Sequence, residues 1–140
     1  MKKCLVLITE DDTEDAEFMK QALRENAFNG DIEHLTNGVQ LMNKLSQMKN
    51  SNMLPEMIIL DLNMPLKNGI EVLNDMNNDI AYKNIPVVVV TASLKKEDEI
   101  NCNKLGCDLY IKKPVRFTEY NDIASRVLSR MKARFPYCEN

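Results

Sequence analysis

The chain has 140 residues, a typical length for one domain, and 44% of them are hydrophobic while 28% are charged. This balance is typical of a folded, soluble protein and excludes a largely disordered chain. The net charge of −3 gives no electrostatic reason to expect binding to nucleic acid or to an anionic membrane.

Strand-like and helix-like segments alternate along the first part of the chain. Residues 5–8 form a short, continuous apolar run, which is typical of a strand buried on both faces. Thr13 is a suitable N-cap for the helix that we expect next, because its hydroxyl can accept a backbone hydrogen bond. A weaker strand at residues 32–35 and a helix at residues 39–48 follow.

The rest of the chain repeats this alternation. Gly106 is a good stop for the helix before it, since glycine readily adopts the conformation that ends many helices. In chain order we predict a strand at residues 57–60, a helix at 70–76, a strand at 87–90, a helix at 97–105, a strand at 109–111 and a helix at 117–134.

Five strands that alternate with five helices predict an α/β fold. The expected architecture is a doubly wound, five-stranded parallel sheet with helices on both faces. In such sheets a ligand binds beyond the carboxyl ends of the strands, where the strand order reverses. The residues that follow each predicted strand are therefore the place to look for chemistry.

Polar side chains stand at the ends of four of these strands. Glu10 and Asp11 follow the first strand, and Asp61 follows the third. Thr91 ends the fourth strand, and Lys113 comes just after the fifth. Because the carboxyl ends of parallel strands meet at one edge of the sheet, we expect these five side chains to lie together.

This group of side chains predicts metal-assisted phosphorylation of a carboxylate. Clustered carboxylates repel one another unless a cation is present, and oxygen ligands without imidazole or thiolate suit Mg²⁺. An aspartate in such a cluster can attack a phosphoryl group and form an acyl phosphate. The Lys113 ammonium and the Thr91 hydroxyl can then stabilise the charge on the phosphoryl oxygens.

The chain resembles the receiver domains of two-component response regulators, which have a flavodoxin-like fold. The resemblance covers nearly the whole chain and implies a single receiver domain over residues 1–140 with no output domain. The matching motifs, in the order and at the spacing usual for the family, are Glu10-Asp11, Asp61-Leu62-Asn63-Met64-Pro65 with Gly69, Thr91-Ala92 and Lys113-Pro114.

The resemblance implies a role for each matching residue. Asp61 is expected to be the phosphoacceptor, with Thr91 and Lys113 in contact with the phosphoryl group. The Mg²⁺ ligands are expected to be Glu10, Asp11, Asp61 and the backbone carbonyl of Asn63. A third acid in the first loop, Asp12, is expected to be solvated or to lie outside the set of metal ligands.

Two further features follow from the resemblance. The Lys113–Pro114 peptide bond is expected to be cis. Tyr110 matches the aromatic residue that, together with Thr91, reports phosphorylation. We expect Tyr110 to be exposed before phosphorylation and to turn inward once Thr91 bonds a phosphoryl oxygen, although a packing role for Tyr110 without switching stays open.

The implied function is that of a signalling switch and not of a turnover enzyme. The protein would take the phosphoryl group from the phosphohistidine of a sensor histidine kinase or phosphotransfer protein, catalyse its own phosphorylation and lose the group slowly to water. Output would reach a downstream protein target by conformational change, without direct DNA or membrane binding. A homodimer through the predicted elements at residues 97–105, 109–111 and 117–134 is compatible with the family pattern.

The subfamily can also be predicted. The Glu-Asp-Asp start of the first loop, the long segment at residues 79–85 before Pro86 and the lack of an output domain resemble the small regulators that are paired with phytochrome-type kinases.

Two other functions fit the sequence less well. An aspartate-nucleophile hydrolase of the haloacid-dehalogenase kind needs a second aspartate two residues after the nucleophile, but Asn63 stands there. A degenerate receiver that acts only as an interaction module should lack one of the acidic or lysine positions, and none is lost.

No catalytic or metal-binding role is expected for His34 or for the cysteines. His34 lies in the weak second strand, where a structural or surface role is expected. The chain shows neither a run of roughly 20 apolar residues nor a signal peptide, so we expect a cytoplasmic protein. The four cysteines have no zinc-site spacing, and we expect inert thiols that stay reduced there: Cys4, Cys102, Cys107 and Cys138.

Overall fold

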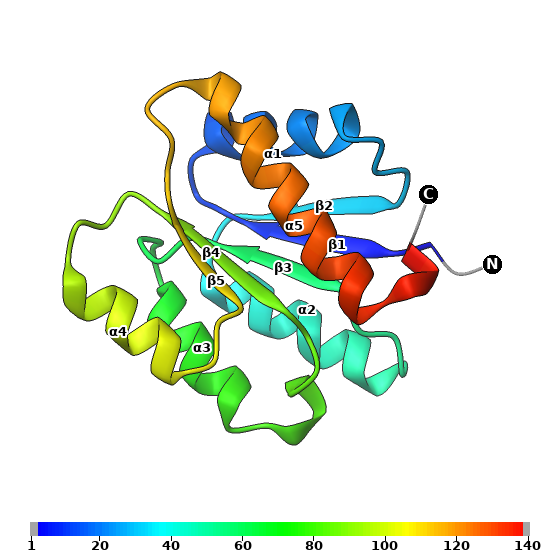
Figure 1. Cartoon of the computed structure of the whole chain (residues 1–140). Helices are drawn as coiled ribbons and strands as arrows, with labels where there is room; N and C mark the ends of the chain where they lie inside the picture. Colours follow the sequence, from blue (N-terminus) through cyan, green and yellow to red (C-terminus); the bar gives the residue numbers. More distant parts are fainter. Residues whose placement is uncertain (1–2, 139–140) are drawn as a thin grey trace.

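A single parallel sheet runs through the middle of the molecule, with strands in the order β2-β1-β3-β4-β5. The computed structural model describes residues 3–138, and Figure 1 traces the chain through them. The predicted doubly wound, five-stranded fold is confirmed. The strands are β1 (Leu5–Thr9), β2 (Asp31–Leu35), β3 (Met57–Leu60), β4 (Val87–Thr91) and β5 (Leu109–Lys112).

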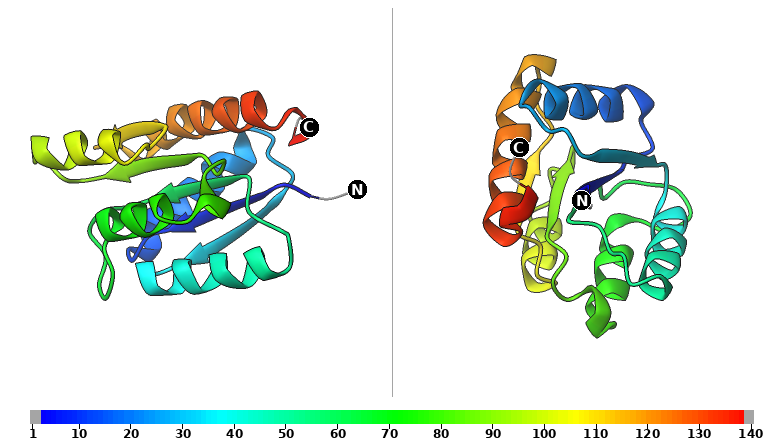
Figure 2. Two further views of the ribbon diagram at one scale, coloured as in Figure 1. Left: turned by 90° about the horizontal axis from the view of Figure 1, so that it is seen from below. Right: turned by 90° about the vertical axis from the view of Figure 1, so that its right-hand side faces the viewer.

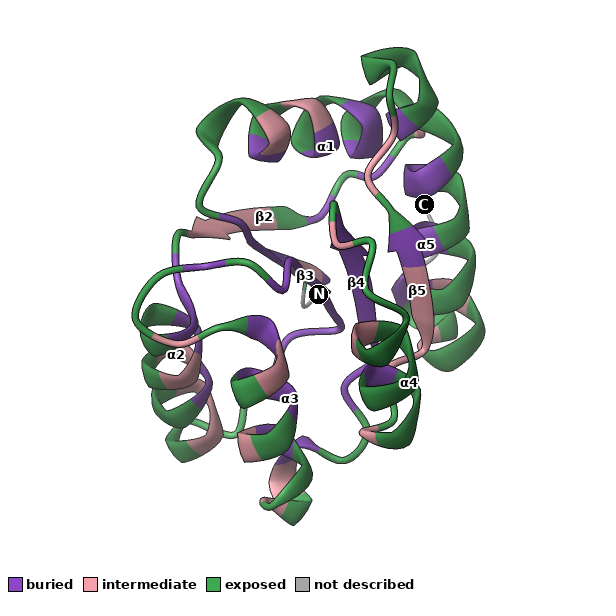
Figure 3. Cartoon of the chain, turned by 90° about the vertical axis from the view of Figure 1, so that its left-hand side faces the viewer, coloured by how far each residue is buried: buried purple, intermediate pink, exposed green. Residues whose placement is uncertain are grey.

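The sheet is buried on both faces because its apolar side chains alternate between two hydrophobic clusters. In β1, Val6 and Ile8 pack on one face while Leu7 packs on the other. The three middle strands are almost wholly buried, as the purple colouring of β3 and β4 in Figure 3 shows. Continuous apolar runs were therefore a reliable sign of central strands.

Helices cover both faces of the sheet. Figures 1 and 2 show α1 and α5 together over one face and α2, α3 and α4 over the other. Within residues 3–138, no helix is both long and apolar enough to cross a bilayer. The helices are α1 (Thr13–Glu25), α2 (Gly38–Asn50), α3 (Gly69–Asn77), α4 (Lys96–Lys104) and α5 (Tyr120–Arg134), with short 3₁₀ turns at η1 (Ile80–Tyr82), η2 (Phe117–Glu119) and η3 (Pro136–Cys138).

Two helix starts differ from the prediction. The N-cap of α1 is Asp12 and not Thr13, because the Asp12 backbone is extended and its carboxylate accepts the Asp15 N–H at 3.0 Å. Both residue types cap helices well, so the sequence alone could not decide between them. The last helix begins at Tyr120, since the three residues before it form the η2 turn.

The strand order reverses between β1 and β3. After β1 the chain forms β2 on one side and then crosses to form β3 on the other side of β1. Thr9 of β1 pairs with Leu60 of β3. The next residues along the two strands, Glu10 and Asp61, therefore leave the sheet side by side at the point where α/β sheets bind ligands.

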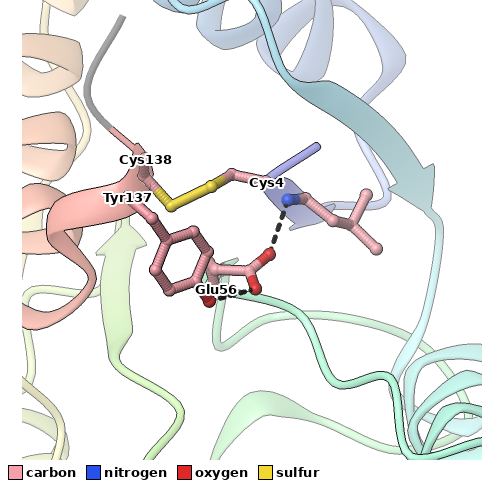
Figure 4. The surroundings of a disulfide bond; sticks show 5 residues. Cys4, Glu56, Tyr137 and Cys138 are labelled. Atoms are coloured by element: carbon pink, nitrogen blue, oxygen red, sulfur yellow. Dashed lines mark hydrogen bonds between the residues drawn. A yellow bond between two sulfur atoms is a disulfide. The ribbon is translucent and has the colours of Figure 1, made fainter. Parts of the chain in front are cut away.

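A disulfide joins the two ends of the described chain, contrary to the expectation of reduced thiols. Cys4, just before β1, is bonded to Cys138 in η3, with Cα atoms 5.8 Å apart. Cys102 and Cys107 are free. The prediction was wrong because sequence spacing does not reveal that α5 returns the chain to the amino-terminal edge of β1, where Figure 4 shows the bond.

The disulfide lies beside a second tie between the same segments. Glu56 is only 2% exposed, and its carboxylate accepts the Leu5 N–H and the Tyr137 hydroxyl, both at 2.8 Å. Figure 4 shows these bonds next to the two sulfur atoms. The segment after α5 is thus held against the start of β1 and β3, at the edge of the sheet opposite to Asp61.

Candidate phosphorylation site

The structure brings the predicted side chains together at the carboxyl edge of the sheet. Glu10 and Asp61 are buried, with 6% and 4% of their surface exposed, whereas Asp11 faces solvent. Thr91, at the end of β4, is fully buried. Lys113 follows β5, and its backbone N–H donates to the Thr91 carbonyl at 2.8 Å.

The Lys113 ammonium is the centre of this cluster. Its Nζ lies 2.8 Å from Glu10 Oε1 and 3.2 Å from Asp61 Oδ2. It also lies 2.9 Å from Oδ2 of Asp15, a residue that the sequence analysis did not single out. Asp15 lies in the first turn of α1, whose amino-terminal end follows the loop after β1 at the same edge of the sheet.

The electrostatics of the cluster favour an additional cation. Burial raises the pKa of Glu10 well above its ordinary value; the hydrogen bond from Lys113 opposes this shift, and the charge of Asp61 adds to it. Burial alone would lower the pKa of Lys113, but its bonds to Glu10 and Asp15 raise it above the ordinary lysine value. The ammonium is thus firmly charged, yet it is outnumbered by carboxylates.

Three of these carboxylates could hold a metal ion. Oxygen atoms of Glu10, Asp11 and Asp61 all lie within 4.8 Å of one another. The group contains only carboxylate donors, which suit a hard ion such as Mg²⁺ or Mn²⁺. The exposed Asp11 leaves the group open to solvent, so an ion could bind and keep water or phosphate ligands.

The Asp61 carboxylate is oriented by its own loop. Its Oδ1 accepts the N–H of Leu62 at 2.7 Å, which leaves Oδ2 facing Lys113. The start of α3 packs closely on this turn, because a Cβ on Gly69 would lie 2.5 Å from the Asp61 carbonyl oxygen. Only glycine fits that position without moving backbone, which explains its place in the motif.

Thr91 is placed so that its hydroxyl can take a new partner. The Oγ1 atom accepts the N–H of Ser93 at 3.2 Å, and the hydroxyl proton is then free to be donated elsewhere. This geometry agrees with the predicted role of Thr91 as a donor to a phosphoryl oxygen, a role that stays a prediction.

Tyr110 does not start from the exposed position that we expected. The residue is half-buried: its side chain packs against the cluster beneath α2, α3 and α4, and its hydroxyl oxygen is shielded from solvent. Burial also raises the pKa of Tyr110. The reason is the strand alternation: Tyr110 pairs with Val89 of β4, and both side chains point to the same face.

The smaller expectations have mixed outcomes. Asp12 is exposed and caps α1, in agreement with its expected place outside the metal ligands. His34 Nε2 donates to the Glu10 backbone carbonyl at 2.6 Å, a structural role.

The Lys113–Pro114 peptide bond is trans, since residues 3–138 contain no cis peptide bond. The expectation of a cis bond was wrong; both isomers of a bond to proline are accessible to a folded chain, because they differ by only about 0.5–1 kcal/mol.

Comparison with known proteins identifies the class. The family model of the response regulator receiver domain matches residues 6–125. The chain therefore belongs to the response regulator receiver domain family of two-component signalling.

Individual relatives indicate the subfamily within this family. The chain is 33% identical over 112 residues to the response regulator Rcp1 of Synechocystis sp., covering 78% of this chain and 76% of that protein. The crystal structure of the phosphorylated cyanobacterial phytochrome response regulator RcpA is similar at a TM-score of 0.82 and 29% identity, covering 93% of this chain and 96% of that one. The Mn²⁺-bound form of Rcp1 gives a TM-score of 0.79 at 28% identity, with 90% and 92% covered. These likenesses support the predicted phytochrome-associated subfamily.

Proposed function

We propose that the protein accepts a phosphoryl group on Asp61 from the phosphohistidine of a sensor histidine kinase or phosphotransfer protein. The observation that carries this proposal is the buried Asp61 carboxylate, which faces the Lys113 ammonium at 3.2 Å inside an acidic cluster. In the transfer an Asp61 oxygen forms a bond to phosphorus, while the P–N bond of the donor breaks and its imidazole leaves with the electron pair. Phytochrome-type kinases are the expected partners, since RcpA is described as a phytochrome response regulator.

The metal of this proposal is a divalent ion bound by Glu10, Asp11 and Asp61, with the Asn63 backbone carbonyl as a further ligand. When bound, it would neutralise charge on the phosphoryl oxygens. The Mn²⁺-bound form of Rcp1 supports such an ion in this family. Two side chains of the protein would act with the ion. Lys113 would donate a hydrogen bond to the phosphoryl group, and the Thr91 hydroxyl would bond a phosphoryl oxygen and so sense phosphorylation.

We infer that the protein acts as a switch and signals to a protein partner. Phosphorylation would turn the Thr91 hydroxyl toward a phosphoryl oxygen and change the surface formed by α4, β5 and α5, through which a homodimer or a downstream target could be bound. Because Tyr110 is already half-buried and packed against the core, a change in its surroundings, and not a rotation from solvent, would carry the signal. A two-state element biased by a new bond is sufficient for this purpose.

The test is incubation with a small acyl phosphate and Mg²⁺, followed by measurement of the intact mass. We expect one added phosphoryl group, and we expect chelation of divalent ions to abolish the addition. Asp11→Ala should weaken Mg²⁺ affinity at least several-fold, because it removes an exposed ligand that makes no ion pair with Lys113. Equal Mg²⁺ affinity in wild type and Asp11→Ala, or labelling in the presence of excess chelator, would contradict the proposed metal site.

The two neighbouring lysines provide a second test. Lys113→Ala removes the ammonium between Glu10 and Asp61, so the phosphorylated protein should lose most of its conformational response, more than it loses labelling. Lys112 is exposed, and Lys112→Ala should be nearly silent. Amide chemical shifts with and without a beryllofluoride phosphate mimic measure the response. A large effect of Lys112→Ala would show that the wrong lysine was assigned.

A further inference from the structure

Asp15 makes a contact that the family motifs do not include. Its Oδ2 lies 2.9 Å from Lys113 Nζ, across a separation of 98 residues in the chain. The contact joins the first turn of α1 to the loop after β5. Both side chains are mostly shielded from water, with 27% of Asp15 and 16% of Lys113 exposed, so the interaction is stronger than an ion pair on the surface.

A helix-stabilising role does not account for this contact. Acidic side chains are common in the first turn of a helix, where they interact with the positive end of its dipole. Glu14 already occupies that turn and is exposed, and Asp12 caps the helix. Only Asp15 of these three side chains reaches Lys113.

Of the three carboxylates around Lys113, two have further proposed roles and Asp15 has none. Glu10 and Asp61 belong to the group that could hold a metal ion, and Asp61 is the proposed phosphoacceptor. Their oxygens would be drawn toward the ion and the phosphoryl group. Asp15 has no part in either set, so it can keep its bond to Lys113 when the other two are engaged.

We propose that Asp15 is a positioning residue that holds the Lys113 ammonium beside Asp61 during phosphoryl transfer. The inference rests on the proposed function of Asp61. A lysine side chain is a flexible four-carbon stem that ends in a compact charge, so it needs a partner to keep one orientation. Asp15 supplies that partner from a rigid helix, and the ammonium is then aimed at the phosphoryl oxygens before they arrive.

The kinetic test compares three variants under saturating Mg²⁺ with a small acyl phosphate. Asp15→Asn should lower the maximal phosphorylation rate about tenfold, while half-saturation by the donor stays near the wild-type value. Asp15→Glu keeps the carboxylate and should recover part of the rate. Glu14→Gln removes one charge from the same helical turn and should leave the rate unchanged. An Asp15→Asn rate equal to that of wild type, or an equal loss in Glu14→Gln, would overturn the proposal.

A spectroscopic test separates this proposal from the proposed function. An ammonium held in ion pairs exchanges protons slowly enough to give its own ¹H–¹⁵N signal, which Lys113→Ala identifies. With Mg²⁺ and no phosphodonor, this signal should persist in wild type and Glu14→Gln and vanish in Asp15→Asn. If wild type takes no phosphate, the proposed function fails, yet the signal still tests the Asp15 contact. If labelling occurs and the signal survives in Asp15→Asn, only the positioning role is wrong.

Discussion

Asp61→Asn should abolish phosphorylation while leaving the fold intact. Asparagine has nearly the shape of aspartate and can still accept the Leu62 N–H, but an amide is not a nucleophile toward phosphorus. The substitution also removes one negative charge from a buried cluster in which Asp61 raises the pKa of Glu10. Less repulsion should leave the melting temperature unchanged or higher, although Lys113 loses one of its three partners.

The matched control is Asp12→Asn. Asp12 lies in the first loop of the same edge, is exposed and caps α1, a role that asparagine performs equally well. Wild type and Asp12→Asn should gain one phosphoryl group that hydroxylamine removes, as expected for an acyl phosphate, and Asp61→Asn should gain none. A hydroxylamine-sensitive phosphate on Asp61→Asn at the normal rate would move the phosphoacceptor to another carboxylate.

The sheet and the main site could be predicted because both depend on short stretches of sequence: the apolar runs of the strands and the residues that follow them. Central strands appear as continuous apolar runs, since both of their faces are buried, and the parallel order sends every strand end to the same edge. The motif residues then meet without any knowledge of loop geometry. Thr9 and Leu60 pair across β1 and β3, which is enough to bring Glu10 beside Asp61.

Contacts between distant loops could not be predicted in this way. The bond between Asp15 and Lys113 depends on how α1 leaves the sheet, and the sequence shows only that Asp15 lies near the start of a predicted helix. The position of Tyr110 could have been inferred from strand alternation, because it lies between Leu109 and Ile111, which pack on the opposite face. The family pattern predicts an exposed position, which was wrong, whereas strand alternation predicts the observed packing.

The cysteines were the least predictable feature. Whether Cys4 meets Cys138 depends on the length and direction of α5 and on the turn that follows it, and neither can be read from cysteine spacing. The prediction of reduced thiols rested on the expected cytoplasmic location, where cellular reductants keep most cysteines reduced. The bond has consequences for stability that can be measured.

Reduction of the Cys4–Cys138 disulfide should destabilise the domain substantially without stopping phosphorylation. The two cysteines are 134 residues apart, so the bond closes a loop that includes nearly all of the chain. Constraining so long a loop in the unfolded chain stabilises the folded state by about 2–5 kcal/mol. For a domain of this size, the melting temperature should fall by roughly 10 °C. The bond lies at the edge of the sheet opposite to Asp61, so the rate of labelling should be unchanged below the melting transition.

The measurement compares melting temperatures with and without dithiothreitol, with intact mass used to confirm the state of the thiols. Cys138→Ser should melt like reduced wild type and should not respond to the reductant. Cys107→Ser, which alters a free cysteine, should keep the full response. In the reduced protein the hydrogen bond between Tyr137 and Glu56 still ties this segment to the strands, and Tyr137→Phe should lower its stability further, by about 1 kcal/mol. An oxidised wild type that melts at the same temperature as the reduced protein would show that the unfolded chain gains nothing from losing this constraint, contrary to the loop argument.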